Sequence, residues 1–348
     1  MKIAQVAPLI ESVPPKTYGG TERIVSYLTE ELVRQGHQVT LFASADSQTS
    51  AQLVPIVPRA LRLDPNVKDY VPYTVLQLEK LRQHADAFDV IHFHTDFMHL
   101  PLARALMPQR TVTTMHGRLD LPDYKPLFAE FSDSPLVSIS NQQRQPLAGA
   151  NWVGTVYHGL PPSVCRFTAQ PRGEYLAFLG RISPEKRPDR AIEIAARAGM
   201  RLKIAAKVDA ADVTYFRTQI EPLLSQPHVE YIGEINEEQK QEFLGNALAL
   251  LFPIDWPEPF GLVMIEAMSC GTPCIAWRAG SVPEIIDHGV TGFIVDSIDD
   301  AVHAVRRAAM LNRAAVRARF EQRFSAERMA RDYVQIYRRL IEERRKAA

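Results

Sequence analysis

The chain is most informative at residues 256–273, which read WPEPFGLVMIEAMSCGTP and hold two glutamates eight residues apart. Glu258 lies between two prolines, where no helix can yet run, whereas the residues after Gly261 have the apolar character of a packed helix. Glu266 falls inside that run and is costly to bury unless it meets hydrogen-bond donors, which ligand hydroxyls would supply. The backbone amides at the helix start, at Gly261 and Leu262, would face a phosphate. This stretch therefore indicates a site for a sugar nucleotide.

Short apolar runs alternate with longer amphipathic ones along the chain, a pattern typical of parallel sheets whose strands are joined by helices. The first series predicts a helix over about 21–35 and strands at 2–8, 38–43, 90–94, 111–116, 136–140 and 155–158. The second series predicts strands at 175–180, 202–207, 229–233, 248–253, 274–277 and 292–295. Since 348 residues are enough for two cores, we expect an α/β protein of two domains joined by the turn-rich segment 161–173.

Two cations stand at the end of one predicted strand of the second series. Arg181 follows the strand directly, and Lys186 lies just before Pro188, where a helix is expected to begin. Cations at a strand end beside a helix start suit a diphosphate, which gains negative charge when it leaves a sugar. The alternative is a solvated surface pair.

Several further motifs follow one another in order along the chain. They read TYGGTE at 17–22, GHQV at 36–39, HG at 116–117, LGRISPEK at 179–186 and GTP at 271–273. Together with the two glutamates, they resemble the motifs of the retaining glycosyltransferases of family 4 over nearly the whole chain. The resemblance implies the GT-B fold, in which two Rossmann-like domains face each other across the ligand cleft.

The resemblance also gives each part of the chain a role. Residues 1–168 would form the acceptor-binding domain, residues 169–325 the donor-binding domain, and residues 326–348 a helix that crosses back to the N-terminal domain. Five large side chains of the last segment recur at helical spacing, namely Met329, Tyr333, Ile336, Tyr337 and Leu340. Because residues 303–348 carry 13 basic and 5 acidic side chains, a helix lying on an anionic membrane is the alternative.

The resemblance implies a donor site and a reaction. The residues that would bind the donor are Gly20, Arg181, Lys186, Glu258, Phe260, Gly261, Leu262 and Glu266. Arg181 and Lys186 would stabilise the leaving diphosphate, Glu258 would bind the sugar hydroxyls and Glu266 the ribose. His116 would lie beside the transferred sugar and complete a catalytic set with Arg181, Lys186 and Glu258. Tyr18, His94 and Asp96 would contact the acceptor.

The implied reaction moves a hexose from a nucleoside diphosphate to an acceptor hydroxyl with retention at the anomeric carbon. The leaving phosphate would take the acceptor proton, so that neither a side-chain base nor a metal or other cofactor is needed. UDP-glucose is slightly favoured over GDP-mannose as donor, and a saccharide, a glycolipid and a small alcohol remain open as acceptors. Two departures from the family pattern weaken the choice of base and sugar: residues 205–209 replace a glycine-rich turn, and His158 stands where asparagine is common.

Two other classes of protein compete with this interpretation. His92 and His94 would point to the same face of a strand and, with Asp96, could begin the site of a metal-dependent hydrolase. Against it, a further His, Asp or Glu cluster at metal-ligand spacing is missing from the sequence. A binding protein that holds a nucleotide sugar without turning it over is the second alternative, although retention of all four charged site residues argues against it.

Composition limits partners and location. The 40 basic residues balance the 40 acidic ones, so the overall charge favours no nucleic acid. Cys165, Cys270 and Cys274 are an odd, sparse set that we interpret as packed thiols in a reducing cytoplasm. No apolar run approaches the length that spans a membrane, which leaves peripheral contact with the inner membrane face as the most that we expect.

Overall fold

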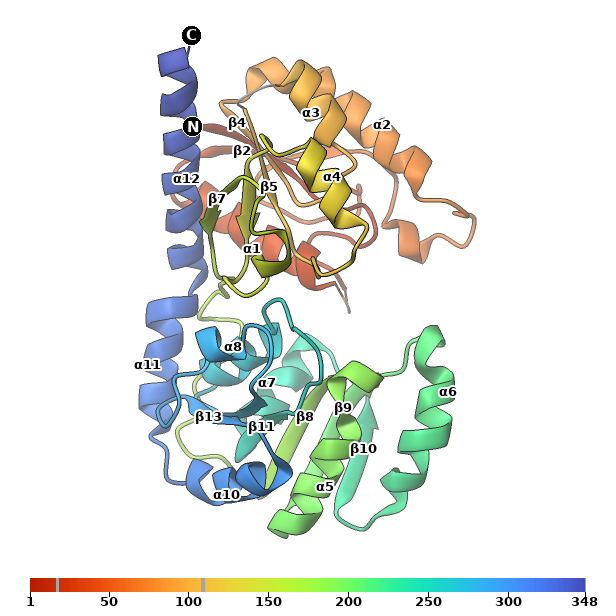
Figure 1. Ribbon diagram of the computed structural model, residues 1–348, viewed down its shortest axis with the longest axis vertical. Coiled ribbons are helices and arrows are strands. Elements are labelled where there is room, and N and C mark those ends of the chain that lie inside the picture. The colour runs from red at the N-terminus through yellow and green to blue at the C-terminus, as the bar shows by residue number, and fades with distance from the viewer. Residues whose placement is uncertain (17–18, 108–109, 348) are drawn as a thin grey trace. The chain divides into compact units, whose positions relative to one another are not determined.

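The computed structural model describes residues 1–16, 19–107 and 110–347 and divides into two compact units (Figure 1). Unit 1 consists of Met1–Gly159 together with Ala326–Ala348, and unit 2 of Leu160–Ser325. The expected first boundary, after residue 168, therefore falls inside unit 2. Residues 160–168 belong there because Leu160 donates its backbone N–H to Phe324 O at 2.9 Å and Thr168 donates to Cys270 O at 3.0 Å.

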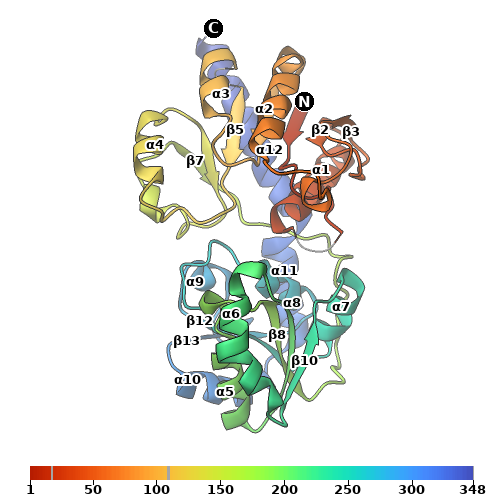
Figure 2. The ribbon, with the colours of Figure 1, turned by 90° about the vertical axis from the view of Figure 1, so that its right-hand side faces the viewer.

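Unit 1 is built on a seven-stranded sheet in the order β3-β2-β1-β4-β5-β6-β7, with every pair parallel. The strands are β1 (Lys2–Val6), β2 (Gln38–Ala43), β3 (Gln52–Pro55), β4 (Val90–Phe93), β5 (Thr111–Thr114), β6 (Leu136–Ser138) and β7 (Trp152–Thr155). The helices are α1 (Gly20–Arg34), α2 (Val71–Arg82), α3 (Leu100–Leu106), α4 (Tyr124–Glu130) and α12 (Ala326–Ala347). In Figures 1 and 2, α2 and α3 cover one face of the sheet and α12 the other.

Unit 2 holds a six-stranded parallel sheet in the order β10-β9-β8-β11-β12-β13. Its strands are β8 (Tyr175–Arg181), β9 (Arg201–Lys207), β10 (Val229–Gly233), β11 (Ala249–Phe252), β12 (Cys274–Trp277) and β13 (Gly292–Val295). Its helices are α5 (Pro188–Ala198), α6 (Val213–Tyr215), α7 (Glu237–Gly245), α8 (Leu262–Ser269), α9 (Val282–Ile285), α10 (Ile298–Ala308) and α11 (Arg313–Phe324). Apolar residues of α5 and α10 pack together on one face of this sheet.

Two strands of unit 1 differ from the sequence prediction. β3 was not expected, because Gln52–Pro55 is a short, half-buried edge strand that ends in a proline and has little apolar periodicity. β7 lies at Trp152–Thr155 rather than at 155–158. Its Gly154 breaks the apolar pattern, and a contact with a residue far away in sequence requires the glycine. A Cβ at this position would come within 2.9 Å of Ile336 Cδ1, so the glycine allows α12 to approach the strand.

The last helix, α12, belongs to unit 1. Tyr333, Tyr337 and Met329 are fully buried, and Ile336 and Leu340 nearly so. Several arginines of this region bind backbone carbonyls of the fold instead of facing solvent alone; Arg328, for example, donates to Tyr157 O at 2.7 Å. Within the described part of the chain, no helix combines the length and the apolar character needed to cross a bilayer.

Candidate functional site

The sequence-predicted residues lie where each parallel sheet ends at the carboxyl side of its strands. In unit 2, Arg181 is the last residue of β8, the strand that pairs with both β9 and β11. In unit 1, His94 follows β4 and His116 follows β5. The sheet order turns back at β1 and β4 in unit 1, and at β8 and β11 in unit 2. Ligands of doubly wound folds bind at such switch points.

Lys186 and Glu258 form a direct ion pair in unit 2. The ammonium group of Lys186 contacts Oε2 of Glu258, and the indole Nε1 of Trp256 donates to the same oxygen at 3.0 Å. The Lys186 Nζ also lies 5.0 Å from the centroid of the Trp256 ring and 5.5 Å from that of Phe252. The predicted sugar-binding carboxylate is therefore held by one of the predicted diphosphate cations, with two aromatic rings beside them.

The backbone beside Lys186 adopts an unusual conformation. Arg187 has φ 52° and ψ 54°, in the left-handed region, and immediately precedes α5. Its guanidinium group donates to Asp189 Oδ2 at 2.6 Å and to Asp255 Oδ2 at 3.0 Å, which fixes this turn against the loop after β11. Such strained residues concentrate at functional sites because the surrounding contacts must over-determine them.

Arg181 is surrounded by carboxylates. Its Nη2 lies 2.9 Å from Glu185 Oε1, and its Nη1 lies 3.5 Å from Asp209 Oδ2 and 3.7 Å from Asp212 Oδ2. Asp209 belongs to the segment that replaces the glycine-rich turn of the family. A diphosphate that binds Arg181 would therefore compete with these carboxylates for the N–H donors of the guanidinium group.

Glu266 makes its ion pair with a residue that sequence reasoning missed. Its Oε1 lies 2.8 Å from Nζ of Lys240, and the same Nζ lies 2.8 Å from Oε1 of Glu237. Burial alone would lower the pKa of Lys240, but the charges of the two glutamates raise it. The capping box of Asn236 and Gln239 marks the start of α7 in the sequence, whereas nothing local indicates that Lys240 meets α8.

A second missed feature is the loop that supports Glu258. The backbone N–H of Ser281 donates to Glu258 O at 3.0 Å, and the Ser281 hydroxyl donates to Phe260 O at 2.7 Å. A Cβ on Gly280 would lie 2.3 Å from both N and O of Glu258. Phe260 itself is buried, with its ring edge-on to Phe324, so its side chain supports the loop from the interior.

Gly261 and Leu262 begin α8 as expected, with Gly261 at φ 80° in the cap position. Since glycine carries no side chain to cap the helix, the first backbone N–H groups of α8 remain available to bind an anion. In unit 1, Gly20 is the first residue of α1. Tyr18 lies outside the described residues.

Two candidate residues of unit 1, the half-buried His116 and the buried His94, belong to a network of histidines. His94 Nδ1 lies 2.8 Å from His116 Nε2, and His94 Nε2 lies 2.7 Å from Gln5 Oε1. His92 Nδ1 lies 2.7 Å from the Tyr337 hydroxyl, and His92 Nε2 lies 2.7 Å from Thr114 Oγ1. Burial lowers the pKa of His116 to about 3 and holds the pKa of His94 well below its usual range, so both rings are neutral at pH 7.

The same contacts bear on the metal alternative. Both ring nitrogens of His92 and of His94 are engaged, so neither ring offers a free lone pair to a metal. Asp96 is exposed and adopts φ 53°, a left-handed conformation that aspartate tolerates. Among the described residues, no group of three or more His, Cys, Asp or Glu side chains has the arrangement of a metal site.

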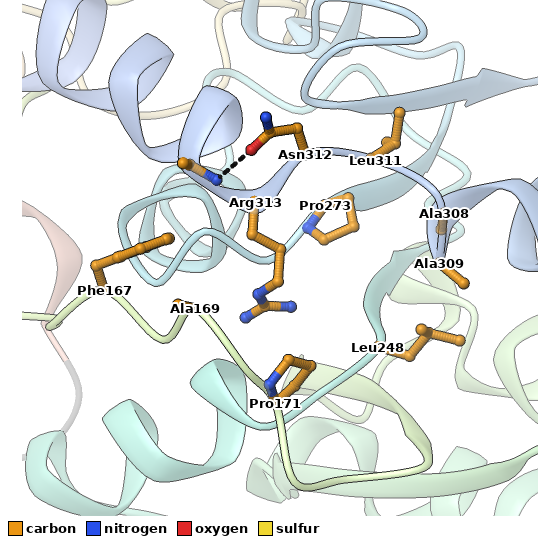
Figure 3. Close-up of a pocket in the computed structure, with 11 residues that line it drawn as sticks. Phe167, Ala169, Pro171, Leu248, Pro273, Ala308, Ala309, Leu311, Asn312 and Arg313 are labelled. Atoms are coloured by element: carbon orange, nitrogen blue, oxygen red, sulfur yellow. Dashed lines mark hydrogen bonds between the residues drawn. The ribbon is translucent and has the colours of Figure 1, made fainter.

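A separate pocket of about 420 Å³ lies at the opposite, amino-terminal side of the strands of unit 2, beside Leu248 and Pro273 (Figure 3). Figure 3 shows the Arg313 side chain extending into it between Phe167 and Pro171. The guanidinium group donates to Thr168 O at 2.8 Å and to Gly245 O at 2.8 Å, among other acceptors. Arg313 thus links the backbone carbonyls of several loops at the amino-terminal side of the strands. None of the predicted site residues that the structure describes lines this pocket.

Solved structures share this architecture over nearly the whole chain. A sucrose-phosphate synthase from Thermosynechococcus elongatus has a TM-score of 0.80 at 19% identity, covering 99% of this chain and 100% of that one. AviGT4, a glycosyltransferase involved in avilamycin A biosynthesis, has a TM-score of 0.78 at 25% identity, covering 98% of each chain. Two parallel-sheet units of this kind make up the GT-B fold.

Sequence comparison narrows the class to a family. Residues 18–150 match the family model described as Glycosyltransferase Family 4, and residues 167–324 match the one described as Glycosyl transferases group 1. An N-acetyl-alpha-D-glucosaminyl L-malate synthase from Bacillus anthracis is 26% identical over 92% of this chain and 93% of that protein. A D-inositol 3-phosphate glycosyltransferase from Mycolicibacterium smegmatis is 26% identical over 85% and 81%, respectively. The chain belongs to family 4 of the glycosyltransferases.

Proposed function

We propose that this glycosyltransferase moves a hexose from a nucleoside-diphosphate sugar to an acceptor hydroxyl with retention, and that its donor is UDP-glucose. The observation that carries the proposal is the Lys186–Glu258 ion pair beside the start of α8. It joins a cation suited to a diphosphate with a carboxylate suited to sugar hydroxyls in one contact. The preference for UDP-glucose over GDP-mannose rests on the family resemblance.

The proposed steps follow from the charges of these groups. Lys186 has three N–H donors and Glu258 uses one of them, so the ammonium group can bind the diphosphate without releasing the carboxylate. As the sugar–phosphate bond breaks, the diphosphate gains charge, and Lys186, Arg181 and the amides at the start of α8 stabilise it. Glu258 meanwhile accepts hydrogen bonds from the sugar hydroxyls and fixes the sugar in place.

The acceptor loses its proton to the leaving phosphate in this proposal, and no metal takes part. A neutral His116 agrees with it, because burial lowers the pKa of this ring to about 3 and its Nε2 is already within 2.8 Å of His94. His116 would shape the reaction face instead of removing the proton. His94 and Asp96 remain proposed contacts of the acceptor.

For the acceptor we propose only a chemical class and no single compound. The names of the two relatives contain L-malate and D-inositol 3-phosphate, which are small hydroxyl compounds with acidic groups. They support a small alcohol beside the saccharide and glycolipid classes. A screen should therefore include hydroxy acids, inositol phosphates, oligosaccharides and short-chain glycolipids.

The test begins with thermal-shift binding of UDP-, GDP- and ADP-sugars to the purified chain, followed by donor turnover in EDTA with the acceptor screen. We expect UDP-glucose to give the largest shift and an α-linked product by NMR. A β-linked product would exclude retention. Binding without turnover of any donor would favour the non-catalytic binding protein, and activity lost in EDTA but restored by zinc would favour the metal-dependent hydrolase.

A further inference from the structure

Glu258 presents its two carboxylate oxygens to very different surroundings. Both of the contacts that the structure gives this side chain end on Oε2, one from the Lys186 ammonium group and one from the Trp256 indole N–H at 3.0 Å. Within the described residues, Oε1 receives no hydrogen bond from the protein. The Glu258 side chain keeps only 11% of its surface exposed, so few positions remain from which a ligand can reach it.

Two donors on one oxygen fix the plane of the carboxylate, but they differ in what a ligand does to them. Lys186 is a cation that also serves the diphosphate, so its hydrogen bond to Oε2 weakens, without breaking, as the leaving group gains charge. Trp256 has one donor, no acceptor and no charge, so its hydrogen bond to Oε2 is unaffected by that change. Its ring also lies against the Lys186 ammonium group, at 5.0 Å from ring centroid to Nζ.

We propose that Trp256 is a positioning residue that holds Oε2 of Glu258 throughout the reaction, so that Oε1 is the oxygen that accepts hydrogen bonds from the donor sugar. This inference rests on the proposed function, because it assigns the sugar contact of the same site. Trp256 acts through Glu258 and touches neither the nucleotide nor the diphosphate. It therefore governs the reactive placement of the sugar while leaving the affinity for the nucleotide unchanged.

Trp256→Phe tests this assignment, because it keeps an aromatic ring beside Lys186 but has no N–H to donate to Oε2, although its ring is also smaller. The matched control is Trp152→Phe, which removes an indole hydrogen bond of 2.8 Å to Leu147 O in unit 1. For each protein, titration calorimetry gives the Kd of UDP, and steady-state kinetics give kcat and KM with UDP-glucose. If the wild type uses GDP-mannose instead, GDP and GDP-mannose replace this pair.

We expect Trp256→Phe to lower kcat about tenfold or more, as for a lost hydrogen bond to a charged group, while the Kd of UDP changes less than about twofold. Trp152→Phe should leave both values unchanged. The proposal is overturned if kcat of Trp256→Phe stays within about twofold of the wild type. It is equally overturned if the affinity for UDP falls as much as kcat does, since Trp256 would then support the whole pocket.

A second measurement does not depend on activity. The indole N–H signal of Trp256, identified by its absence from Trp256→Phe, should move in the NMR spectrum of Glu258→Gln, because an amide oxygen accepts more weakly than a carboxylate. An unmoved signal would show that Trp256 does not hold Glu258. A wild type that turns over no nucleotide sugar would instead contradict the proposed function, and the NMR result would still decide whether the contact exists.

Discussion

At the scale of single residues, the two glutamates of the most informative stretch share one physical requirement. Both are buried, and each is paired with a lysine from another element, Glu258 with Lys186 and Glu266 with Lys240. A buried carboxylate without such a partner would be strongly destabilising. The two pairs differ in their neighbourhood, because the first contains the candidate diphosphate cation Lys186 and lies beside Trp256.

The first prediction concerns the charge of Glu258, the proposed sugar-binding carboxylate. Glu258→Gln keeps the size of the side chain but removes the charge that pairs with Lys186 and that we propose to bind the sugar hydroxyls, so we expect kcat to fall roughly 10²- to 10³-fold. Arg181→Ala should lower turnover by a similar factor through the diphosphate. Circular dichroism should show that both variants fold. Near-normal turnover in either one would remove that residue from the site.

The second prediction separates structure from catalysis at Glu266. Lys240→Met leaves the Glu266 carboxylate buried without its cation, which should lower the free energy of unfolding by about 3–5 kcal/mol. Lys240→Met combined with Glu266→Gln should recover most of that loss, because the unpaired charge is gone. Urea unfolding of the three proteins measures both quantities. If the single and double variants had equal free energies of unfolding, the unpaired charge of Glu266 would not be the cause of the lost stability.

At the scale of elements, the loop of Glu258 is shaped by contacts from a distant part of unit 2. Gly280 has φ 51°, and its Cα faces the backbone of Glu258, while Ser281 hydrogen bonds to Glu258 O and Phe260 O. The position of the carboxylate is consequently set by the turn after β12 as well as by its own loop.

The third prediction uses two glycines with similar backbone conformations. Gly280→Ala would place a Cβ 2.3 Å from Glu258 N and O, which must move the loop and should lower turnover at least about tenfold. Gly289→Ala is the control, because φ is 81° there and no atom lies within 4 Å of the added Cβ. Both variants carry the same kind of backbone strain. If their turnover falls equally, strain and not the clash is responsible.

The elements also show why some features could be predicted from sequence and others could not. The strands of unit 2 lie where apolar runs are bounded by turn residues, and the central strands β11 and β12 are buried along nearly their whole length, whereas the edge strand β10 is half-exposed. The half-buried edge strand β3 lacks that signal. Likewise, Arg181 and Glu258 belong to local motifs, whereas the roles of Lys240 and Gly280 arise from contacts with residues far away in sequence.

At the scale of the whole molecule, burial of histidines links stability to pH. Burial lowers the pKa of His99 and His116 to about 3 and that of His92, His94 and His158 well below the usual range. In the unfolded chain these groups titrate near pH 6.5. Between the two values the unfolded state binds more protons, so stability is fully present above about pH 6.5 and is lost as pH falls toward the folded pKa.

The fourth prediction is the size of that effect. Each buried histidine should reduce the free energy of unfolding by about 1.4 kcal/mol per pH unit below pH 6.5, so the summed slope is steep. His99→Phe should make the slope shallower by the contribution of one histidine, because a phenyl ring can still stack on Phe93, 3.8 Å away between ring centroids, but does not titrate. Urea unfolding from pH 8 to pH 5 measures it. A flat profile would refute the prediction.

The fifth prediction concerns α12. Removing the chain after Ser325 exposes the surface that Met329, Tyr333 and Tyr337 cover, and it leaves His92 and Thr114 without their tyrosine partners. We expect unit 1 of the truncated protein to unfold less cooperatively in lipid-free buffer, with a thermal transition that is broader and lies at a lower temperature. Unchanged stability, together with the loss of binding to anionic vesicles, would show that the helix is chiefly a membrane anchor.

The place of α12 in the chain has a consequence for biosynthesis. Unit 2 is continuous in sequence, whereas unit 1 is interrupted by it and takes its last helix from residues that leave the ribosome after the whole of unit 2. Chains emerge at roughly 5–20 residues per second. Gln5, His92 and Thr114 therefore lack their hydrogen-bond partners Tyr333 and Tyr337 for several seconds or longer. The nascent protein therefore completes its second unit before its first. Quality-control factors that bind incomplete domains would meet this enzyme through the open face of unit 1.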